Sequence, residues 1–406
     1  MKNNFLRKMM SAGRLTSRGK LMEATTAIQR ALAAAQLPST PVRSAATAAF
    51  RAPASPLAST STKSAEPRRD SAGDAVDTVT DIDEVDQARD SDRRDASRFA
   101  ASSFTGAGGT RVFKLFEPAC SGNRALPLVV MLHGCTQNPD DFAAGTRMNE
   151  LAAASGFYVL YPEQAARSNA NRCWNWFVPG DQQRGLGEPA LIAGMTKHVI
   201  EAHGIDPDRV YVAGLSAGGA MAAILAREYP DVFAAAGVHS GLPAGAANDV
   251  ASAFGAMKSG AAAAGPGTGA IAGWPLGASA SMWPGAAAEP AAAAPIRASA
   301  PQIVFHGSAD STVAPANGDA VVTAALAGRA ETRPAQTSGV AAGGRRWRRA
   351  VWRDGDRPVA EQWVVDGAPH AWSGGSRAGS FTDPDGPDAS AEMLRFFLEH
   401  RQQRPG

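Results

Sequence analysis

A serine stands between two glycines in the stretch Gly214-Leu215-Ser216-Ala217-Gly218. The apolar run before it is typical of a strand, and the small residues after it are typical of a helix. Ser216 is therefore expected in a tight strand-to-helix turn, where glycines avoid clashes and the hydroxyl is exposed. The pattern predicts a nucleophilic serine, and the alternative is an ordinary glycine-rich turn.

A nucleophilic serine needs a base that removes its proton and a carboxylate that orients the base. When the serine lies in such a turn, the acid and then the histidine follow it along the chain, each in a loop after a strand. Asp310 follows the apolar run of IVFHGSAD, and His370 follows that of EQWVVDGAPH. We therefore predict that Ser216, Asp310 and His370 form a catalytic triad.

Other acidic residues and histidines fit these roles less well. Asp319 lies inside the helix that is expected after Pro315, and Asp366 is so close to His370 in sequence that we expect it to shape the turn. The remaining histidines lie on helices, at the ends of earlier strands or near the C-terminus; they are His133, His198, His203, His239, His306 and His400. His133 and His306 are expected to be hydrogen-bonded structural residues beneath the site.

Attack on a carbonyl creates an oxyanion, which backbone N–H groups stabilise. Ala217 begins the predicted helix, so its N–H and the positive end of the helix dipole face the serine. The second donor is expected in the loop Gly134-Cys135-Thr136-Gln137, through the main chain of Cys135.

Three tryptophans flank these loops and fit either an apolar wall for an acyl chain or ordinary core packing. They are Trp174, Trp176 and Trp372. The chemistry of a serine triad requires no cofactor.

The chain has three cysteines, Cys120, Cys135 and Cys173, which is too few for a disulfide scaffold. They lack the paired spacing of a zinc site, so no structural metal is expected. The loops of Cys135 and Cys173 are both expected to approach the site. A disulfide between them and a pair of reduced thiols therefore stay open as alternatives.

Continuous apolar strands alternate with helices from about Phe104 onward. The predicted strands are RVFKLFEP, LPLVVMLHG, FYVLYPE, RVYVAGL, AAAGVHSG, PQIVFHGSAD and EQWVVDGAPHAW. This alternation predicts an α/β fold with a mostly parallel sheet, helices on both faces, and reactive groups at the carboxyl ends of the strands.

Three segments are distinguished by composition. Residues 1–36 are expected to form an amphipathic helix, because Leu21, Thr25, Ile28 and Leu32 recur at helical spacing. Residues 37–103 are rich in Pro, Ser and charge, which is typical of a disordered linker. Residues 104–402 form the predicted folded domain, with an Ala/Gly/Pro-rich insertion between Gly241 and Ala300.

The charge balance argues against nucleic acid as a partner, and the hydropathy argues against a transmembrane segment. The chain has 40 basic and 38 acidic residues, a net charge of +2, which argues against binding nucleic acid. It lacks the apolar run of a signal peptide and that of a membrane span. We therefore expect a cytoplasmic protein, with the amphipathic helix either packing on the protein or binding a granule surface. An extracellular location is the alternative.

Seven stretches together resemble the poly(3-hydroxybutyrate) depolymerase family of esterases, which also includes feruloyl and acetylxylan esterases. They are LVVMLHGCTQNPDDFA, NELAAASGFYVLYPEQ, CWNWF, GLSAGGAMAA, IVFHGSADSTVAPANGD, GAPHAWSGG and SFTDPDGPDASAEMLRFFLEH. The resemblance runs from about Phe104 to His400. The N-terminal GKLMEATTAIQRAL also resembles leaders of bacterial members without signal peptides.

The resemblance implies an α/β-hydrolase fold and serine ester hydrolysis. Ser216, Asp310 and His370 match the family triad, and Cys135 matches its oxyanion loop. The insertion from about Ala261 to Ala294 is longer and simpler than the family pattern, so polymer, oligomer and small ester stay open as substrates.

The expected function is hydrolysis of poly(3-hydroxybutyrate) or hydroxyalkanoate oligomers through an acyl-enzyme. One alternative is a feruloyl or acetylxylan esterase. Another is a granule-associated binding protein whose hydrolase domain is vestigial, against which the complete set of triad residues argues.

Overall fold

The computed structural model describes residues 97–106, 109–119, 125–261, 299–329 and 333–402. The predicted helix within residues 1–36, most of the predicted linker, Cys120 and residues 262–298 of the insertion lie outside the described residues. Granule binding through residues 1–36 therefore stays a prediction.

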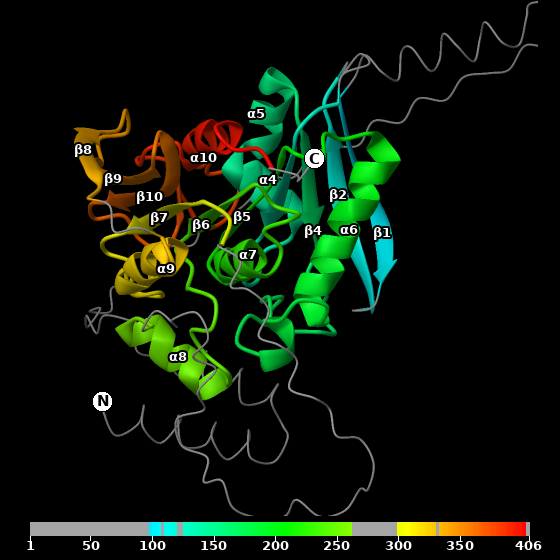
Figure 1. Ribbon diagram of the computed structural model, residues 1–406, viewed down its shortest axis with the longest axis horizontal. Helices are drawn as coiled ribbons and strands as arrows, with labels where there is room; N and C mark the ends of the chain where they lie inside the picture. The colour runs from blue at the N-terminus through cyan, green and yellow to red at the C-terminus, as the bar shows by residue number, and fades with distance from the viewer. Residues whose placement is uncertain (1–96, 107–108, 120–124, 262–298, 330–332, 403–406) are drawn as a thin grey trace, which may run out of the picture. The chain divides into compact units, whose positions relative to one another are not determined.

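A ten-stranded sheet forms the centre of the described part of the chain, with strand order β1-β2-β4-β3-β5-β6-β7-β10-β9-β8 (Figure 1). The strands are β1 (Arg98–Gly106), β2 (Gly109–Glu117), β3 (Leu128–Leu132), β4 (Tyr158–Pro162), β5 (Val210–Leu215), β6 (Ala235–His239), β7 (Gln302–Gly307), β8 (Ala335–Val340), β9 (Arg346–Asp354) and β10 (Arg357–Val365). A separate pair consists of β11 (Trp372–Ser373) and β12 (Thr382–Asp383).

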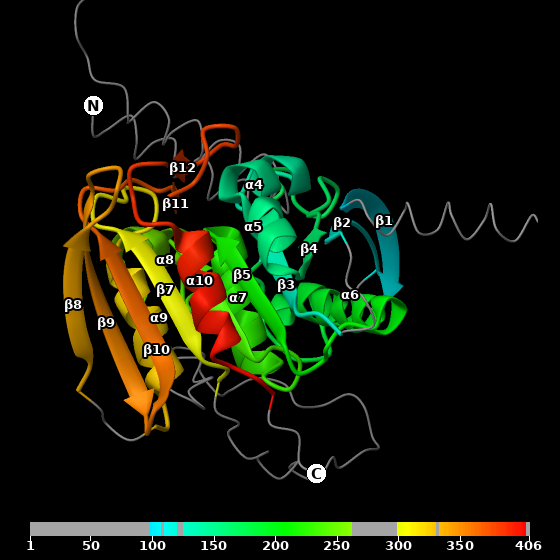
Figure 2. The same ribbon diagram turned by 90° about the horizontal axis from the view of Figure 1, so that it is seen from above.

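Helices cover both faces of this sheet. They are α4 (Pro139–Thr146), α5 (Met148–Ser155), α6 (Gly187–His203), α7 (Ala217–Glu228), α8 (Val250–Ser259), α9 (Ala316–Leu326) and α10 (Ala389–Leu398), with a 3-10 turn η1 (Pro179–Asp181). Helices α6, α7 and α9 lie on one face, and α4, α5 and α10 lie on the other (Figures 1 and 2). The predicted α/β architecture is confirmed.

The central strands β4, β3, β5, β6, β7 and β10 pair in parallel, as predicted from their continuous apolar runs. The flanking pairs β1–β2, β2–β4, β8–β9 and β9–β10 are antiparallel. Strands at the flanks leave one face in water, so their sequences need no continuous apolar run.

Four elements differ most clearly from the sequence prediction. Strand β1 begins at Arg98, so the boundary expected at Phe104 lies inside a strand whose small polar residues resemble a linker. Strands β8 and β9 were not expected, because one is almost wholly exposed and the other carries four arginines. Helix α8 lies in the segment predicted as an insertion, and its N-cap Asp249 forms a capping box with Ser252.

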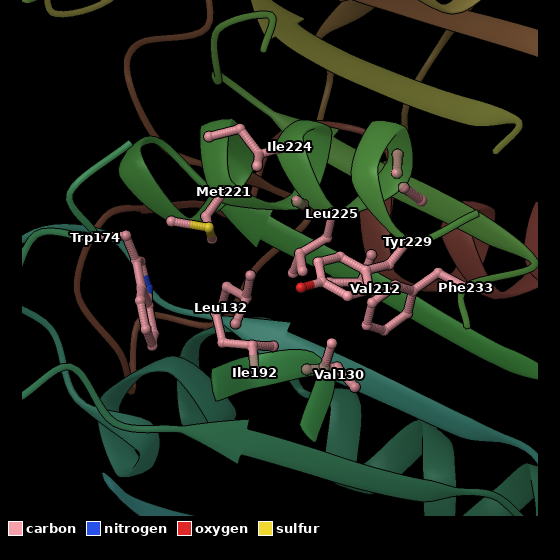
Figure 3. Close-up of a cluster of buried hydrophobic side chains, with 14 of the residues drawn as sticks. Val130, Leu132, Trp174, Ile192, Val212, Met221, Ile224, Leu225, Tyr229 and Phe233 are labelled. Carbon is pink, nitrogen blue, oxygen red and sulfur yellow. The ribbon is translucent and has the colours of Figure 1, made fainter. Parts of the chain in front are cut away.

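Alternate side chains of β3 enter two separate cores. Val130 and Leu132 pack toward α6 and α7, whereas Val129 and Met131 pack toward α5 and α10. On the first side, Ile192 of α6 and Met221 of α7 close the cluster (Figure 3). Fully burying such a side chain contributes about 1.5–3 kcal/mol, and this packing fixes α7 against the sheet.

The start of α7 approaches the end of β3 so closely that only glycine fits at position 218. A Cβ atom on Gly218 would overlap the carbonyl oxygen of Leu132 and would lie 2.7 Å from that of His133. Gly214 has the same constraint, since its Cβ would meet the backbone carbonyl of Gly218. The two glycines around Ser216 therefore permit the close approach of β5, α7 and β3.

We predict that Gly218→Ala destabilises the protein by about 1–3 kcal/mol, because the backbone it would contact must shift. Gly255→Ala is the matched control, since a Cβ on Gly255 of α8 meets nothing within 4 Å. That control is expected to gain about 0.5–1 kcal/mol from helix propensity. Denaturant unfolding measures both changes, and equal stabilities for the two variants would contradict the close approach.

Candidate active site

Ser216 lies in the turn between β5 and α7, where the sequence placed it. Its backbone has φ 58° and ψ −119°, a region that costs a residue with a side chain about 1–3 kcal/mol. The N–H of Ser216 donates to the carbonyl oxygen of His239 at 2.9 Å, which ties the turn to the end of β6. Strain of this kind is typical of a serine presented at a strand end.

The neighbouring strands end at the same level of the sheet. Leu215 of β5 pairs with His239 of β6, His239 pairs with Phe305 of β7, and Phe305 pairs with Trp363 of β10. The loops after these strands therefore leave the sheet along one edge. This register explains how residues far apart in sequence gather at the carboxyl edge.

The loops after β7 and β10 bring Asp310 and His370 together. The N–H of Ala309 donates to the carbonyl oxygen of Ala368 at 3.1 Å, which joins the two loops. The Nδ1–H of His370 donates to Oδ2 of Asp310 at 2.7 Å. This contact orients the imidazole and leaves its Nε2 atom to act as a base.

Asp310 is a buried carboxylate with several hydrogen-bond donors. The N–H groups of Thr312 and Val313 both donate to its Oδ1 at 2.9 Å. Burial alone would raise the pKa of Asp310, but hydrogen bonds from His306 and His370, together with the charge of His370, hold it well below its ordinary value. The carboxylate therefore stays ionised and can stabilise an imidazolium.

The two histidines expected to be structural are both buried and hydrogen-bonded. His306 Nε2 donates to the carbonyl oxygen of Val313 at 2.9 Å and lies 3.4 Å from Asp310 Oδ2. His133 Nδ1 donates to the carbonyl oxygen of Gly134 at 2.8 Å. Each therefore holds the backbone of a loop, His133 the loop after β3 and His306 the loop after β7.

His239 has a role that the sequence analysis did not find. Its carbonyl oxygen holds Ser216, and its Nε2 atom accepts the N–H of Ser373 at 2.9 Å, three residues after His370. Its ring stacks on Phe305 and Trp372. Burial lowers the pKa of His239 to about 3, so the ring stays neutral and Nε2 stays an acceptor. In the sequence, this role is indicated only by the position of His239 at the end of a strand, β6, that neighbours the strand before Ser216.

The predicted oxyanion loop lies against Ser216. A Cβ atom on Gly134 would lie 3.6 Å from the Cβ of Ser216. Gly134 donates its N–H to the Gln137 side chain, and Gln137 donates its backbone N–H to the Gly134 carbonyl. Thr136 donates its backbone N–H to the carbonyl of Asn171, outside the loop. Among the described residues, the N–H of Cys135 is the one backbone N–H of residues 134–137 without a protein acceptor.

Cys135 and Cys173 form a disulfide, with their Cα atoms 4.2 Å apart. This pairing answers the question that the sequence left open between a disulfide and two reduced thiols. The bond links the predicted oxyanion loop directly to the segment Cys173-Trp174-Asn175-Trp176.

The three flanking tryptophans are buried in the two cores. Trp174 and Trp176 belong to the cluster around α7, and Trp372 belongs to the opposite one. The indole N–H groups of Trp174 and Trp372 donate to the His133 carbonyl and the Ser390 hydroxyl. This burial favours the packing role, and a substrate contact of these side chains stays a prediction.

The described ranges contain no group of three or more His, Cys, Asp and Glu side chains that could hold a metal ion. None of their helices combines the length and the apolar character that crossing a membrane takes.

Comparison with solved structures shows the α/β-hydrolase fold. The described arrangement is similar to an acetyl xylan esterase from Aspergillus awamori, with a TM-score of 0.53 and 19% sequence identity. The similarity covers 74% of this chain and 99% of that one. The fold class that the sequence predicted is therefore confirmed.

Sequence comparison confirms the resemblance to the poly(3-hydroxybutyrate) depolymerase family of esterases. Residues 112–272 match the family described as Esterase PHB depolymerase. The chain is 38% identical over 222 residues to poly(3-hydroxyalkanoate) depolymerase C of Paucimonas lemoignei, which covers 52% of this chain and 47% of the relative. It is also 38% identical over 122 residues to feruloyl esterase B of Thermothelomyces thermophilus, which covers 30% of this chain and 41% of the relative. The chain thus spans less than half the length of either relative.

We predict that His239→Phe weakens the link between the serine turn and the histidine loop. The aromatic stacking is retained, but the N–H of Ser373 loses its acceptor, which costs about 1–3 kcal/mol. Denaturant unfolding measures the loss, and hydrogen exchange of the peptide containing Ser373 becomes faster. The control is His198→Phe, on the exposed side of α6. Unchanged exchange at Ser373 would rule out the bridging role.

Proposed function

We propose that this protein hydrolyses carboxylic esters, with Ser216 as nucleophile, His370 as general base and Asp310 as the group that orients the base. The observation that carries this proposal is the partly buried hydrogen bond between His370 Nδ1 and Asp310 Oδ2 at the strand edge that also carries the strained Ser216 turn. The match to an esterase family and the similarity to esterases support it.

In the first half of the reaction, Ser216 Oγ attacks the ester carbonyl carbon while His370 Nε2 accepts the hydroxyl proton. The carbonyl π electrons move to oxygen and give a tetrahedral oxyanion. This oxyanion collapses, the bond to the alcohol oxygen breaks, and His370 returns the proton to the leaving alkoxide. The products are the free alcohol and an ester of Ser216.

In the second half, water replaces the alcohol. His370 removes a proton from the water as its oxygen attacks the acyl carbon, and a second tetrahedral oxyanion forms. Collapse of this intermediate returns the proton to Ser216 Oγ and releases the acid. Asp310 keeps its charge throughout and stabilises the imidazolium of each step.

We further propose that the N–H groups of Cys135 and Ala217 stabilise both oxyanions. The first N–H groups of a helix have no partner within that helix, and Ala217 is the first residue of α7. The Cys135 loop lies beside Ser216, as the Gly134 contact indicates. Loss of one such donor typically lowers the rate by about 10²- to 10³-fold.

The proposed substrates are poly(3-hydroxybutyrate) or hydroxyalkanoate oligomers. The similarity to the poly(3-hydroxyalkanoate) depolymerase extends over 222 residues, against 122 residues for the feruloyl esterase at equal identity. Side-by-side rates on 3-hydroxybutyrate oligomers, polymer granules, feruloyl esters and acetylated xylan separate these classes. Faster turnover of the feruloyl or acetylxylan substrates would overturn the hydroxyalkanoate assignment.

The disulfide bears on where the protein works. Disulfides persist in oxidising compartments and are rare where glutathione keeps thiols reduced. The Cys135–Cys173 bond therefore favours the extracellular alternative over the cytoplasmic location expected from sequence.

We predict that Ser216→Ala lowers kcat on p-nitrophenyl butyrate by about 10⁶-fold, since removal of a triad nucleophile disables the whole unit. The same variant is expected to lose labelling by a fluorophosphonate probe. Ser103→Ala, on the exposed strand β1, is the matched control and keeps both properties. Hydrolysis by the Ser216 variant at the parental rate would refute the assignment, and a folded parent that neither hydrolyses nor labels would favour the binding protein.

A further inference from the structure

Glu188 is a buried carboxylate outside the triad. It is the second residue of α6 and is only 4% exposed. Its Oε2 accepts the backbone N–H of Asn175 at 2.7 Å, and its Oε1 accepts the side-chain amides of Asn175 and Gln164. Both oxygens therefore act as acceptors for residues of one long loop.

The first path from Glu188 leads to the start of the oxyanion loop. The backbone N–H of Gln164 donates to His133 Nε2 at 3.1 Å, and His133 Nδ1 donates to the carbonyl oxygen of Gly134 at 2.8 Å. Burial lowers the pKa of His133 to about 4, so the neutral ring can accept at Nε2 and donate at Nδ1. Gly134 directly precedes Cys135.

The second path reaches Cys135 through the disulfide. The side-chain amide of Gln164 donates to the carbonyl oxygen of Cys173 at 2.9 Å, and Asn175 follows two residues later. Cys173 is bonded to Cys135. Glu188 is thus linked through Gln164 and His133 to the segment before Cys135, and it contacts Asn175 in the segment that the disulfide joins to Cys135.

Titratable groups from three neighbouring elements face Glu188. Arg111 of β2 has Nη2 3.7 Å from Glu188 Oε1, and Asp181 of η1 accepts the Glu188 N–H at 2.7 Å. His133 faces it from the end of β3 through Gln164. Burial, and secondly the charge of Asp181, raises the pKa of Glu188 to about 7. The acceptor capacity of this carboxylate therefore changes near neutral pH.

We propose that Glu188 is a positioning residue that holds the N–H of Cys135 in place for the oxyanion. This inference rests on the proposed ester hydrolysis. A carboxylate at position 188 offers acceptors to the N–H groups of Asn175 and Gln164, whereas a neutral group presents a proton to one of them. The loop then shifts, and through His133 and the disulfide the Cys135 N–H moves with it.

The test compares Glu188→Gln with the parent and with Glu201→Gln, a matched control on the exposed side of α6. Glu188→Gln is expected to lower kcat on p-nitrophenyl butyrate by about 10- to 100-fold with KM within about threefold, because the oxyanion exists in the transition state and not in bound substrate. The inhibition constant of a trifluoromethyl ketone, whose serine adduct carries an oxyanion, rises by the same factor. The control changes none of these values.

The ratio of parental to variant kcat also depends on pH. Above about pH 7 the parent carries the carboxylate, and the ratio is largest. As pH falls below the Glu188 pKa of about 7, the parent becomes protonated and resembles the glutamine variant, so the ratio falls toward one. Any pH dependence that the parent and the variant share divides out of the ratio. A change that acts only on folding would give a constant ratio.

Gln164→Met provides a second variant in case Glu188→Gln folds poorly. It keeps the side-chain length and the backbone bond to His133, but it removes the amide that links Glu188 to Cys173. It is expected to lower kcat and to weaken the binding of the trifluoromethyl ketone by a similar factor. A hydrolytically active parent whose folded variants keep parental kcat and ketone affinity would overturn the inference, as would a kcat loss with unchanged ketone affinity. A parent without ester hydrolysis would instead overturn the proposed function.

Discussion

A buried carboxylate remains ionised only when hydrogen bonds replace the water it has lost, and Asp310 meets that condition. Two backbone N–H groups occupy its Oδ1, and His370 with His306 faces its Oδ2. The contact with His370 in turn requires the loops after β7 and β10 to meet, which the parallel register of these strands ensures. Helices on both faces keep the strands in that register. The ionised state of Asp310 therefore depends on the packing of the core.

The serine turn depends on a second constraint, which is steric. Ser216 has a positive φ, and the glycines on either side lie where backbone carbonyls leave no room for a Cβ atom. The favourable free energy of burying Met221 and neighbouring side chains of α7 against β3 offsets the cost of this strain. His239 then joins the serine turn to the histidine loop with one backbone and one side-chain hydrogen bond. The site is thus held by contacts that involve no reacting atom.

The sequence predicted the central strands from their continuous apolar runs. It predicted the serine turn and the acid–histidine pair because each of these residues follows such a run. It did not predict β1, β8 and β9, whose alternation is obscured by small or basic residues at the flanks of the sheet. Glu188 and His239 were missed for another reason. Their hydrogen-bond partners lie on other elements of the fold, and an isolated acidic or histidine residue has no local pattern that reveals a buried network. The same limit applies to β11 and β12, which lie beside α4 although more than 200 residues separate them in the chain (Figure 2).

The loop that carries Cys135 connects these features, since its disulfide and its hydrogen bonds make it part of the scaffold that also carries Ser216. All of this geometry has a catalytic meaning only if the Asp310 carboxylate orients and stabilises the His370 imidazole. The direct measurement is kcat of Asp310→Asn on p-nitrophenyl butyrate, with near-UV circular dichroism to show that the variant is folded. The account predicts a fall of about 10⁴-fold, since the amide favours the wrong imidazole tautomer. A folded variant with kcat within about tenfold of the parent would contradict it.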